Sequence, residues 1–324
     1  MKYIGIQTQR RRNNLRSASL LLLFPCLMIG LVYLACFLLI QAGVSLSESS
    51  AKVEVAPSVN IMFAAVAPYI LGGVAIWFVI AWFSHSAIIK RATGAKPLER
   101  KENKRVYNLV ENLCMSQGMS MPAINVINDD SLNAFASGIN TRTFAVTLTT
   151  GIIAKLDDDE LESVIAHELT HIRNRDVRVL IISIVFVGIL SVVAQSGFRM
   201  LRHLPVRGGR KKDNGGGAIA IILIVAIVAA VGYFIAALMR FAISKQREYM
   251  ADAGAAQMTQ RPWSLASALR KISQDPLVEA IERKDVAQLF IEDPKDVSLS
   301  SGNFFGLFST HPPIEKRIEI LDRF

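Results

Sequence analysis

Four long uncharged apolar stretches constrain this chain more than any other feature. The first runs from Ser17 to Ser47, and the second runs from Val55 to Ile89, where His85 is the one residue that can carry a charge near neutral pH. Two more uncharged stretches follow, at Val179–Phe198 and Gly215–Met239. About 20 apolar residues suffice to cross a bilayer, and 52% of the chain is hydrophobic. We therefore expect a mainly α-helical membrane protein.

The basic residues of the chain cluster beside these stretches. The net charge of +9 is compatible with nucleic-acid binding, but charges that flank apolar segments are typical of membrane topology signals. A dense group follows the second stretch: Lys90, Arg91, Lys96, Arg100, Lys101, Lys104 and Arg105. By the positive-inside rule, the N-terminus and the chain after residue 90 face the cytoplasm. We expect a lipid bilayer, and no nucleic acid, as partner.

The third and fourth stretches give conflicting topology signals. If both span the bilayer, their connection lies outside, although it carries six basic residues and one acidic residue between Arg199 and Asp213. A hairpin that dips into the membrane, or a hydrophobic lid, would satisfy these charges instead. We favour two spans. The expected divisions are residues 1–90 (a hairpin with spans at 17–42 and 61–83), 91–178 (first soluble part), 179–240 (a second hairpin with spans at 179–198 and 217–239) and 241–324 (second soluble part).

The soluble parts show helix and strand patterns. Asp157 and Glu160 form a D-x-x-E capping box, which predicts a helix that runs through His171 toward Asp176. The remaining patterns predict helices at Leu98–Gln117, Ser264–Ile272 and Pro313–Leu321, and strands at Ala123–Asn128 and Arg142–Leu148. The second strand is a candidate edge strand that could align an extended peptide.

Residues 167–171 read H-E-x-x-H. Helix positions four apart share one face, so His167 and His171 can reach the same metal ion. Zinc in hydrolases takes three protein ligands and leaves a position for water, whose pKa falls to about 7. Glu168 is then placed to accept the water's proton as general base. An accidental match on an exposed helix is the alternative, and it is expected in under about one chain in fifty with five histidines.

The motif requires a third ligand. Glu248 is a candidate, and Asp252 lies on the same helical face four residues later. Asp252 would then accept a hydrogen bond from a ligand histidine or a nearby backbone group. Spacing alone leaves a second reading equally open, in which both carboxylates belong to a solvated helix that follows a membrane segment.

Four segments together resemble one protease family. They are residues 133–138 (N-A-F-A-S-G), 165–176 (I-A-H-E-L-T-H-I-R-N-R-D), 247–252 (R-E-Y-M-A-D) and 309–313 (S-T-H-P-P). In this order, over essentially the whole chain, they resemble the bacterial membrane proteases of the HtpX type, whose relatives include the eukaryotic CAAX-prenyl endoproteases. The resemblance implies an α+β zincin-type (gluzincin) domain with a small β-sheet beside the transmembrane helices.

The resemblance also implies roles for individual residues. One Zn²⁺ per chain is bound by His167, His171 and Glu248, and Glu168 is catalytic. His311 donates a hydrogen bond to the oxyanion or stabilises a turn before two prolines. Asn133 holds the substrate backbone or fixes a turn. Asp176 braces His171 or ends the helix.

The expected activity is that of a zinc metalloendopeptidase of the bacterial inner membrane, a multi-pass protein whose N-terminus and catalytic part are cytoplasmic. Its substrates are polypeptides, and the resemblance implies quality control of misfolded or damaged membrane proteins. A processing protease for one lipidated or C-terminal motif is the alternative within enzymes. A non-catalytic scaffold or transporter is the alternative outside enzymes, but it leaves H-E-x-x-H without a purpose, and the spans lack buried acidic pairs.

Overall fold

The computed structural model describes residues 6–43, 58–203, 215–274 and 312–324. The chain divides into two compact units, and each is built from segments that are separated in the sequence. The sheet-containing unit comprises residues 1–17, 83–182 and 239–324, and the helical unit comprises residues 18–82 and 183–238. The sheet-containing unit is therefore interrupted in the sequence by residues of the helical unit.

The helical unit is formed by parts of four helices, α1 (Ile6–Gln41), α2 (Val59–Thr93), α6 (Asp176–His203) and α7 (Gly215–Thr259). Three stretches of the described chain are long and apolar enough to cross a membrane: Leu22–Gln41, Val59–Thr93 and Asp176–Arg202. The expectation of a helical membrane protein is thus confirmed. The apolar stretch described in α7 is shorter, Ile219–Ile235, so a fourth span stays a prediction.

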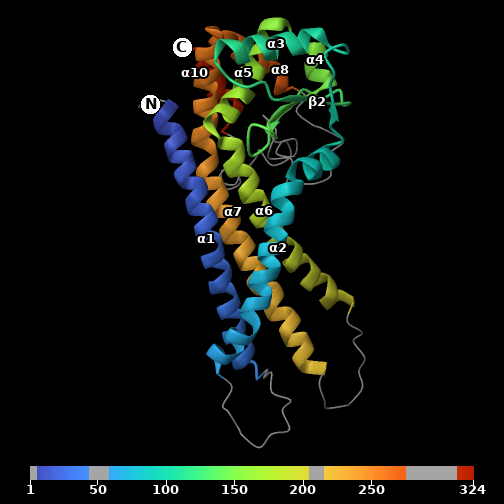
Figure 1. The fold of residues 1–324 in the computed structure, drawn as a ribbon, viewed down its shortest axis with the longest axis vertical. Helices are drawn as coiled ribbons and strands as arrows, with labels where there is room; N and C mark the ends of the chain where they lie inside the picture. Colours follow the sequence, from blue (N-terminus) through green and yellow to red (C-terminus); the bar gives the residue numbers. More distant parts are fainter. Residues whose placement is uncertain (1–5, 44–57, 204–214, 275–311) are drawn as a thin grey trace, which may run out of the picture. The chain divides into compact units, whose positions relative to one another are not determined.

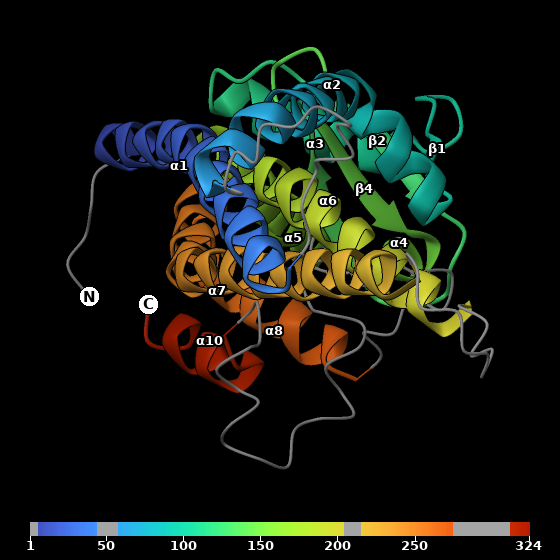
Figure 2. The ribbon, with the colours of Figure 1, turned by 90° about the horizontal axis from the view of Figure 1, so that it is seen from below.

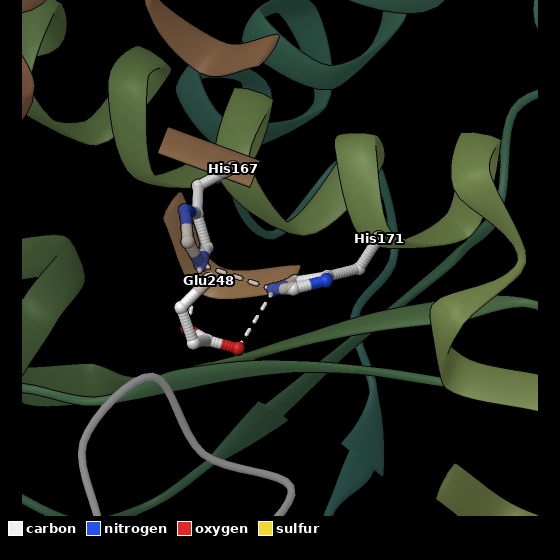
Figure 3. A group of neighbouring side chains, drawn as sticks. All are labelled: His167, His171 and Glu248. Carbon is white, nitrogen blue, oxygen red and sulfur yellow. Dashed lines mark hydrogen bonds and ion pairs between the residues drawn. The ribbon is translucent and has the colours of Figure 1, made fainter. Parts of the chain in front are cut away.

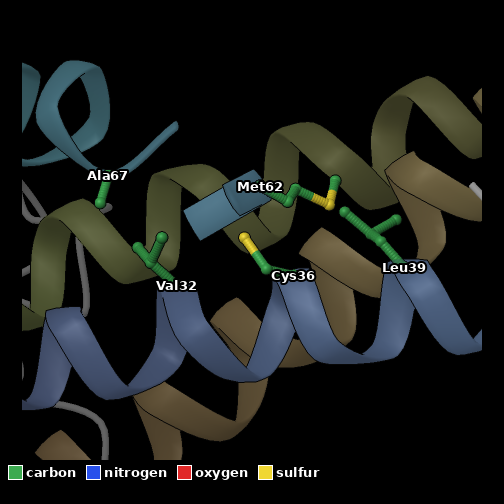
Figure 4. Close-up of a cluster of buried hydrophobic side chains, with 5 residues drawn as sticks. All are labelled: Val32, Cys36, Leu39, Met62 and Ala67. Carbon is green, nitrogen blue, oxygen red and sulfur yellow. The ribbon is translucent and has the colours of Figure 1, made fainter. Parts of the chain in front are cut away.

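Side chains of α1 and α2 form an apolar cluster within the helical unit (Figure 4): Val32, Cys36, Leu39, Met62 and Ala67. Phe24 of α1 stacks on Phe186 of α6, with ring centroids 3.7 Å apart. Other large apolar side chains point outward, such as Tyr69, which is 83% exposed. Outward apolar side chains along long helices are typical of lipid-facing surfaces.

Four strands form a mixed sheet in the order β1-β2-β4-β3. They are β1 (Lys96–Pro97), β2 (Ala123–Ile127), β3 (Ala134–Ser137) and β4 (Ala145–Thr149). β2 and β4 run parallel side by side (Figure 2), and β3 is antiparallel to β4. Both predicted strands are confirmed within a few residues, whereas β1 and β3 had no clear pattern.

The prediction that residues 142–148 form an edge strand is wrong. β4 lies between β2 and β3, so the edges are β1 and β3. β4 also begins later than predicted because residues 138–144 form a tight turn. Gly138 has φ +105°, and the Thr143 hydroxyl accepts hydrogen bonds from the amides of Ile139 and Asn140.

Among its described residues, the sheet-containing unit also has five shorter helices: α3 (Lys104–Ser116), α4 (Thr150–Lys155), α5 (Asp158–Asn174), α8 (Pro262–Ile272) and α10 (Ile314–Leu321) (Figure 1). The helices predicted at 264–272 and 313–321 are confirmed. α3 starts at Lys104 rather than Leu98, because the Asn103 side chain accepts a hydrogen bond from the Val106 amide and caps the helix there.

The capping box at the start of α5 is confirmed. Asp157 accepts a hydrogen bond from the Glu160 amide at 2.9 Å, and Glu160 accepts one from the Asp157 amide at 3.0 Å. Glu160 also accepts hydrogen bonds from Ser267 and Lys271 of α8. The α5 helix that carries H-E-x-x-H is therefore fixed at its N-terminus by α8.

Candidate metal centre

Two helices bring together the residues of the proposed metal site. α5 carries His167 and His171, and α7 carries Glu248. Their ligand atoms all lie within 4.8 Å of one another. The two Nε2 atoms are 3.2 Å apart, and Glu248 carboxylate oxygens lie 3.6 Å from Nε2 of His167 and 3.5 Å from Nε2 of His171. Figure 3 shows both imidazoles and the carboxylate facing one point.

The second nitrogen of each imidazole faces an aspartate. Nδ1 of His167 lies 3.0 Å from Oδ1 of Asp252, and Nδ1 of His171 lies 3.2 Å from Oδ2 of Asp176. Asp176 reaches His171 because α5 ends at Asn174, the next residue, Arg175, has left-handed backbone angles, and α6 starts at Asp176. A proton held on Nδ1 by a carboxylate leaves Nε2 as the metal-binding atom.

Each aspartate in turn contacts a buried arginine to which the sequence patterns assigned no role. Arg317 of α10 donates to both carboxylate oxygens of Asp252, at 2.9 and 2.7 Å, and its Nη1 lies 3.8 Å from Glu248. Nη1 of Arg247 donates to the carbonyl of Asp176 at 3.3 Å. Helical periodicity gave one indication of this role. Arg317 lies on the same helical face as Leu321, which is buried, and a buried cation requires a partner of opposite charge.

The electrostatics of the site favour positive charge between the imidazoles. Burial alone would lower the pKa of His167. Its hydrogen bonds to Asp252 and Glu248 outweigh this effect, so its pKa is raised to about 9. Burial opposes ionisation of Asp252, yet Arg317 holds its pKa below the ordinary value. Burial raises the pKa of Glu168, and the two histidines offset only part of this effect.

The residues fit a zinc ion by geometry and by charge. Two ligands at about 2.0–2.1 Å from a tetrahedral zinc are about 3.3 Å apart, close to the three separations above. Among the described residues, the buried charged groups at the site are four carboxylates and two guanidiniums: Glu168, Asp176, Glu248, Asp252, Arg247 and Arg317. With neutral imidazoles, the excess of two negative charges matches a divalent cation.

A glycine sets the close approach of α7 to α5. A Cβ added at Gly254 would overlap Cγ2 of Thr170 and lie 2.8 Å from its Oγ1. Thr170 stands between His167 and His171 in the sequence of α5. Glycine therefore allows α7 to bring Glu248 within reach of both histidines.

We expect Gly254→Ala to lower both the thermal midpoint and the zinc occupancy. Replacing glycine by alanine stabilises a helix by about 1 kcal/mol. Overpacking against Thr170, however, costs about 1–3 kcal/mol, and it separates the helices that carry the ligands. Thr170→Ala in the same chain should restore part of both losses, because it removes the overlapping atoms. The matched control is Gly188→Ala, where an added Cβ meets nothing within 4 Å. Unchanged zinc occupancy in Gly254→Ala would contradict this role.

The other candidate residues have different surroundings. Asn133 is fully buried, and its Oδ1 accepts a hydrogen bond from the Ala134 amide at the start of β3, at 3.0 Å. That contact is typical of a residue that fixes a turn. His311 lies outside the described residues.

Comparisons with known proteins identify the family. The sequence profile of peptidase family M48 matches residues 100–324. A "Protease HtpX homolog" from Bacteroides fragilis is 62% identical over 325 residues, which is 100% of both chains. A second, from Dictyoglomus turgidum, is 40% identical over 272 residues, 81% of this chain and 86% of the relative.

Among solved structures, Ste24p from S. mikatae aligns with a TM-score of 0.47 and 16% identity, over 97% of this chain and 66% of that chain, just under two thirds of its length. The profile match and the full-length relatives show that this chain belongs to peptidase family M48, as a membrane metalloprotease.

Proposed function

We propose that His167, His171 and Glu248 bind one zinc ion and that Glu168 is the general base of peptide hydrolysis. The supporting observation is the convergence of two Nε2 atoms and a carboxylate within 4.8 Å, with both Nδ1 atoms facing aspartates. Neither a scaffold nor a transporter requires this arrangement.

Each residue has a distinct part in the proposed reaction. Bound zinc supplies a Lewis acid for the water and the scissile carbonyl. Glu168 accepts the proton of the water and returns it to the leaving amine. A carboxylate beside the metal can serve as base in the first step and as acid in the second. Asp252 and Asp176 hold the histidine tautomers. For His311 we keep the proposal of an oxyanion hydrogen bond.

Glu248→Ala should reduce bound zinc from about one ion per chain to a small fraction, because two imidazoles alone provide too few ligands. The measurement is metal analysis of the chain purified in detergent. Glu162→Ala is the control, since Glu162 is on α5 but pairs with Arg261 instead. Full zinc occupancy in Glu248→Ala would refute the third ligand.

We further propose that substrates pair with β3. β3 is an edge strand of the sheet, and the Glu168 carboxylate accepts a hydrogen bond from the backbone of Ala136. A peptide added to this edge would be bound by its main chain, so side-chain preference would be broad. The four residues of β3 are buried, so pairing requires that this edge first be uncovered.

The substrate class we propose is misfolded or damaged membrane proteins, with cleavage on the cytoplasmic side of a bacterial inner membrane. The support is that soluble parts alternate with apolar helices along the sequence, and that basic residues begin in the last turn of α2 and continue after it. Cleavage of a panel of unrelated unfolded proteins tests this role. Many cuts in many substrates agree with quality control, whereas one defined cut supports the alternative of a processing protease.

The proposed domain organisation follows from the same topology. Residues 91–178 and 241–324 form one catalytic part, and residues 1–90 and 179–240 form two membrane hairpins. Labelling of single cysteines by a membrane-impermeant reagent tests it in inverted membrane vesicles, which expose the cytoplasmic side. We expect labelling near residue 101 and none near residue 50, and the reverse pattern would refute the orientation.

A further inference from the structure

A pocket of about 170 Å³ lies in the sheet-containing unit, and none of the metal-centre residues lines it. Its floor includes Asn125 of β2 and Thr147 of β4, which are direct partners in the parallel register and so share one face of the sheet. Ser86 and Lys90 of α2 line the pocket as well. The pocket thus lies between the end of a long apolar helix and a sheet face.

The lining is cationic and rich in hydrogen-bonding groups. Lys90 and Arg142 supply two positive charges, and the described residues that line the pocket include no carboxylate. The hydroxyl-bearing residues are Ser86, Ser137, Thr143 and Thr147. Groups of these two kinds are the usual partners of a phosphate group.

One buried atom indicates a further property of the ligand. Asn125 is 2% exposed, and its Oδ1 has no hydrogen-bond partner among the residues that the structure describes. A buried acceptor without a partner is costly, so such an atom requires an explanation. A ligand that carries an N–H or O–H donor beside its phosphate would satisfy Asn125.

If α2 spans the bilayer as predicted, the pocket lies close to the phospholipid headgroups. α2 has 35 residues, about 52 Å of helix, whereas the hydrocarbon core is about 30 Å thick. If α2 enters the hydrocarbon core of the bilayer near Ile61, about 20 residues carry it across, and it leaves the core near residue 81. The headgroup layer adds about four or five residues and so ends near Ser86. Lys90 lies one turn beyond, and its long side chain can extend back to the phosphates.

We propose that this pocket binds the phosphate of a membrane phospholipid whose headgroup carries a hydrogen-bond donor, such as ethanolamine or glycerol. Lys90 and Arg142 bind the phosphate, and Asn125 accepts a hydrogen bond from the ammonium or hydroxyl group. The lipid thereby links the end of α2 to β2 and β4 at the bilayer surface.

Lipid binding to the detergent-purified full chain, measured by native mass spectrometry, tests the proposal. Phosphatidylethanolamine and phosphatidylcholine form a matched pair, because methylation removes the N–H donors and keeps the phosphate. We expect about fivefold tighter binding of phosphatidylethanolamine to wild type, and loss of this preference in Asn125→Ala. Lys90→Gln and Arg142→Gln should each weaken binding of both lipids about tenfold.

Arg91→Gln is the control variant, since Arg91 neighbours Lys90 in the sequence but does not line the pocket. It should change lipid affinity less than about twofold, and unchanged zinc content in all variants shows that they are folded. Equal losses in Arg91→Gln and Lys90→Gln would overturn the pocket in favour of unspecific surface charge. If inorganic phosphate displaces a bound phosphate compound and no lipid binds, the occupant is soluble and the lipid proposal fails.

Discussion

Glu168→Gln is expected to abolish peptide hydrolysis while zinc stays bound. Glutamine keeps the size and polarity of the side chain but cannot accept the proton of the attacking water. General acid–base catalysis is worth about 10²–10⁴-fold, so we expect a loss of this order in kcat for cleavage of an unfolded substrate protein. The zinc ligands in our proposal exclude Glu168, so metal content should remain about one per chain.

Two results would contradict this assignment. Undiminished cleavage by Glu168→Gln would exclude Glu168 as the base, and loss of zinc would make it a structural contributor to the metal site. Glu162→Gln is the matched control on the same helix, and it should cleave at the wild-type rate. Its carboxylate lies 3.3 Å from Arg261, and it takes no part in the proposed chemistry.

Arg317→Met should have the second largest effect, on stability and on zinc affinity together. Arg317 is 1% exposed and binds Asp252 through two hydrogen bonds, so its loss leaves a buried carboxylate without its cation. Breaking a buried pair in this way costs about 3–5 kcal/mol. Because Asp252 orients His167, zinc affinity should also fall about 10–100-fold. Thermal unfolding and competition with a zinc chelator measure the two effects.

A double variant separates the two contributions of Arg317. Adding Asp252→Asn to Arg317→Met removes the uncompensated charge of the buried carboxylate. The double variant should therefore regain much of the thermal stability, but its zinc affinity should stay low. Arg270→Met is the control, because it breaks an ion pair with Asp322 in which both side chains are about half exposed, and such pairs are worth about 0–1 kcal/mol. Similar losses in Arg270→Met and Arg317→Met would exclude a special role for the buried arginine.

The features that the sequence predicted well are local. The spacing of His167 and His171 and the capping box at Asp157 depend on residues within one helix, so the helical period suffices to place them. β3 was missed because all four of its residues are buried, and it therefore shows no alternation of polar and apolar side chains. Without β3, β4 was placed at the edge of the sheet.

The contacts between helices could not be predicted from local patterns. Sequence spacing left Glu248 equally open to a ligand and to a solvated position, and the resemblance alone favoured the ligand. Which aspartate faces which histidine depends on how α7 and the start of α6 pack against α5. Arg317 contacts Asp252, 65 residues earlier in the chain, and helical periodicity carries no information about a partner at that distance.

The order in which these residues are synthesised has a consequence for a protease that cuts other chains. The two histidines emerge from the ribosome first, Glu248 follows only after the apolar residues of α6 and α7, and Arg317 comes later still. At about 5–20 residues per second, a nascent chain spends several seconds with an incomplete metal site. Because Glu248 completes the proposed ligand set, hydrolytic activity begins only after the intervening helices have been made. The interruption of the domain by apolar helices thus delays hydrolytic activity during synthesis.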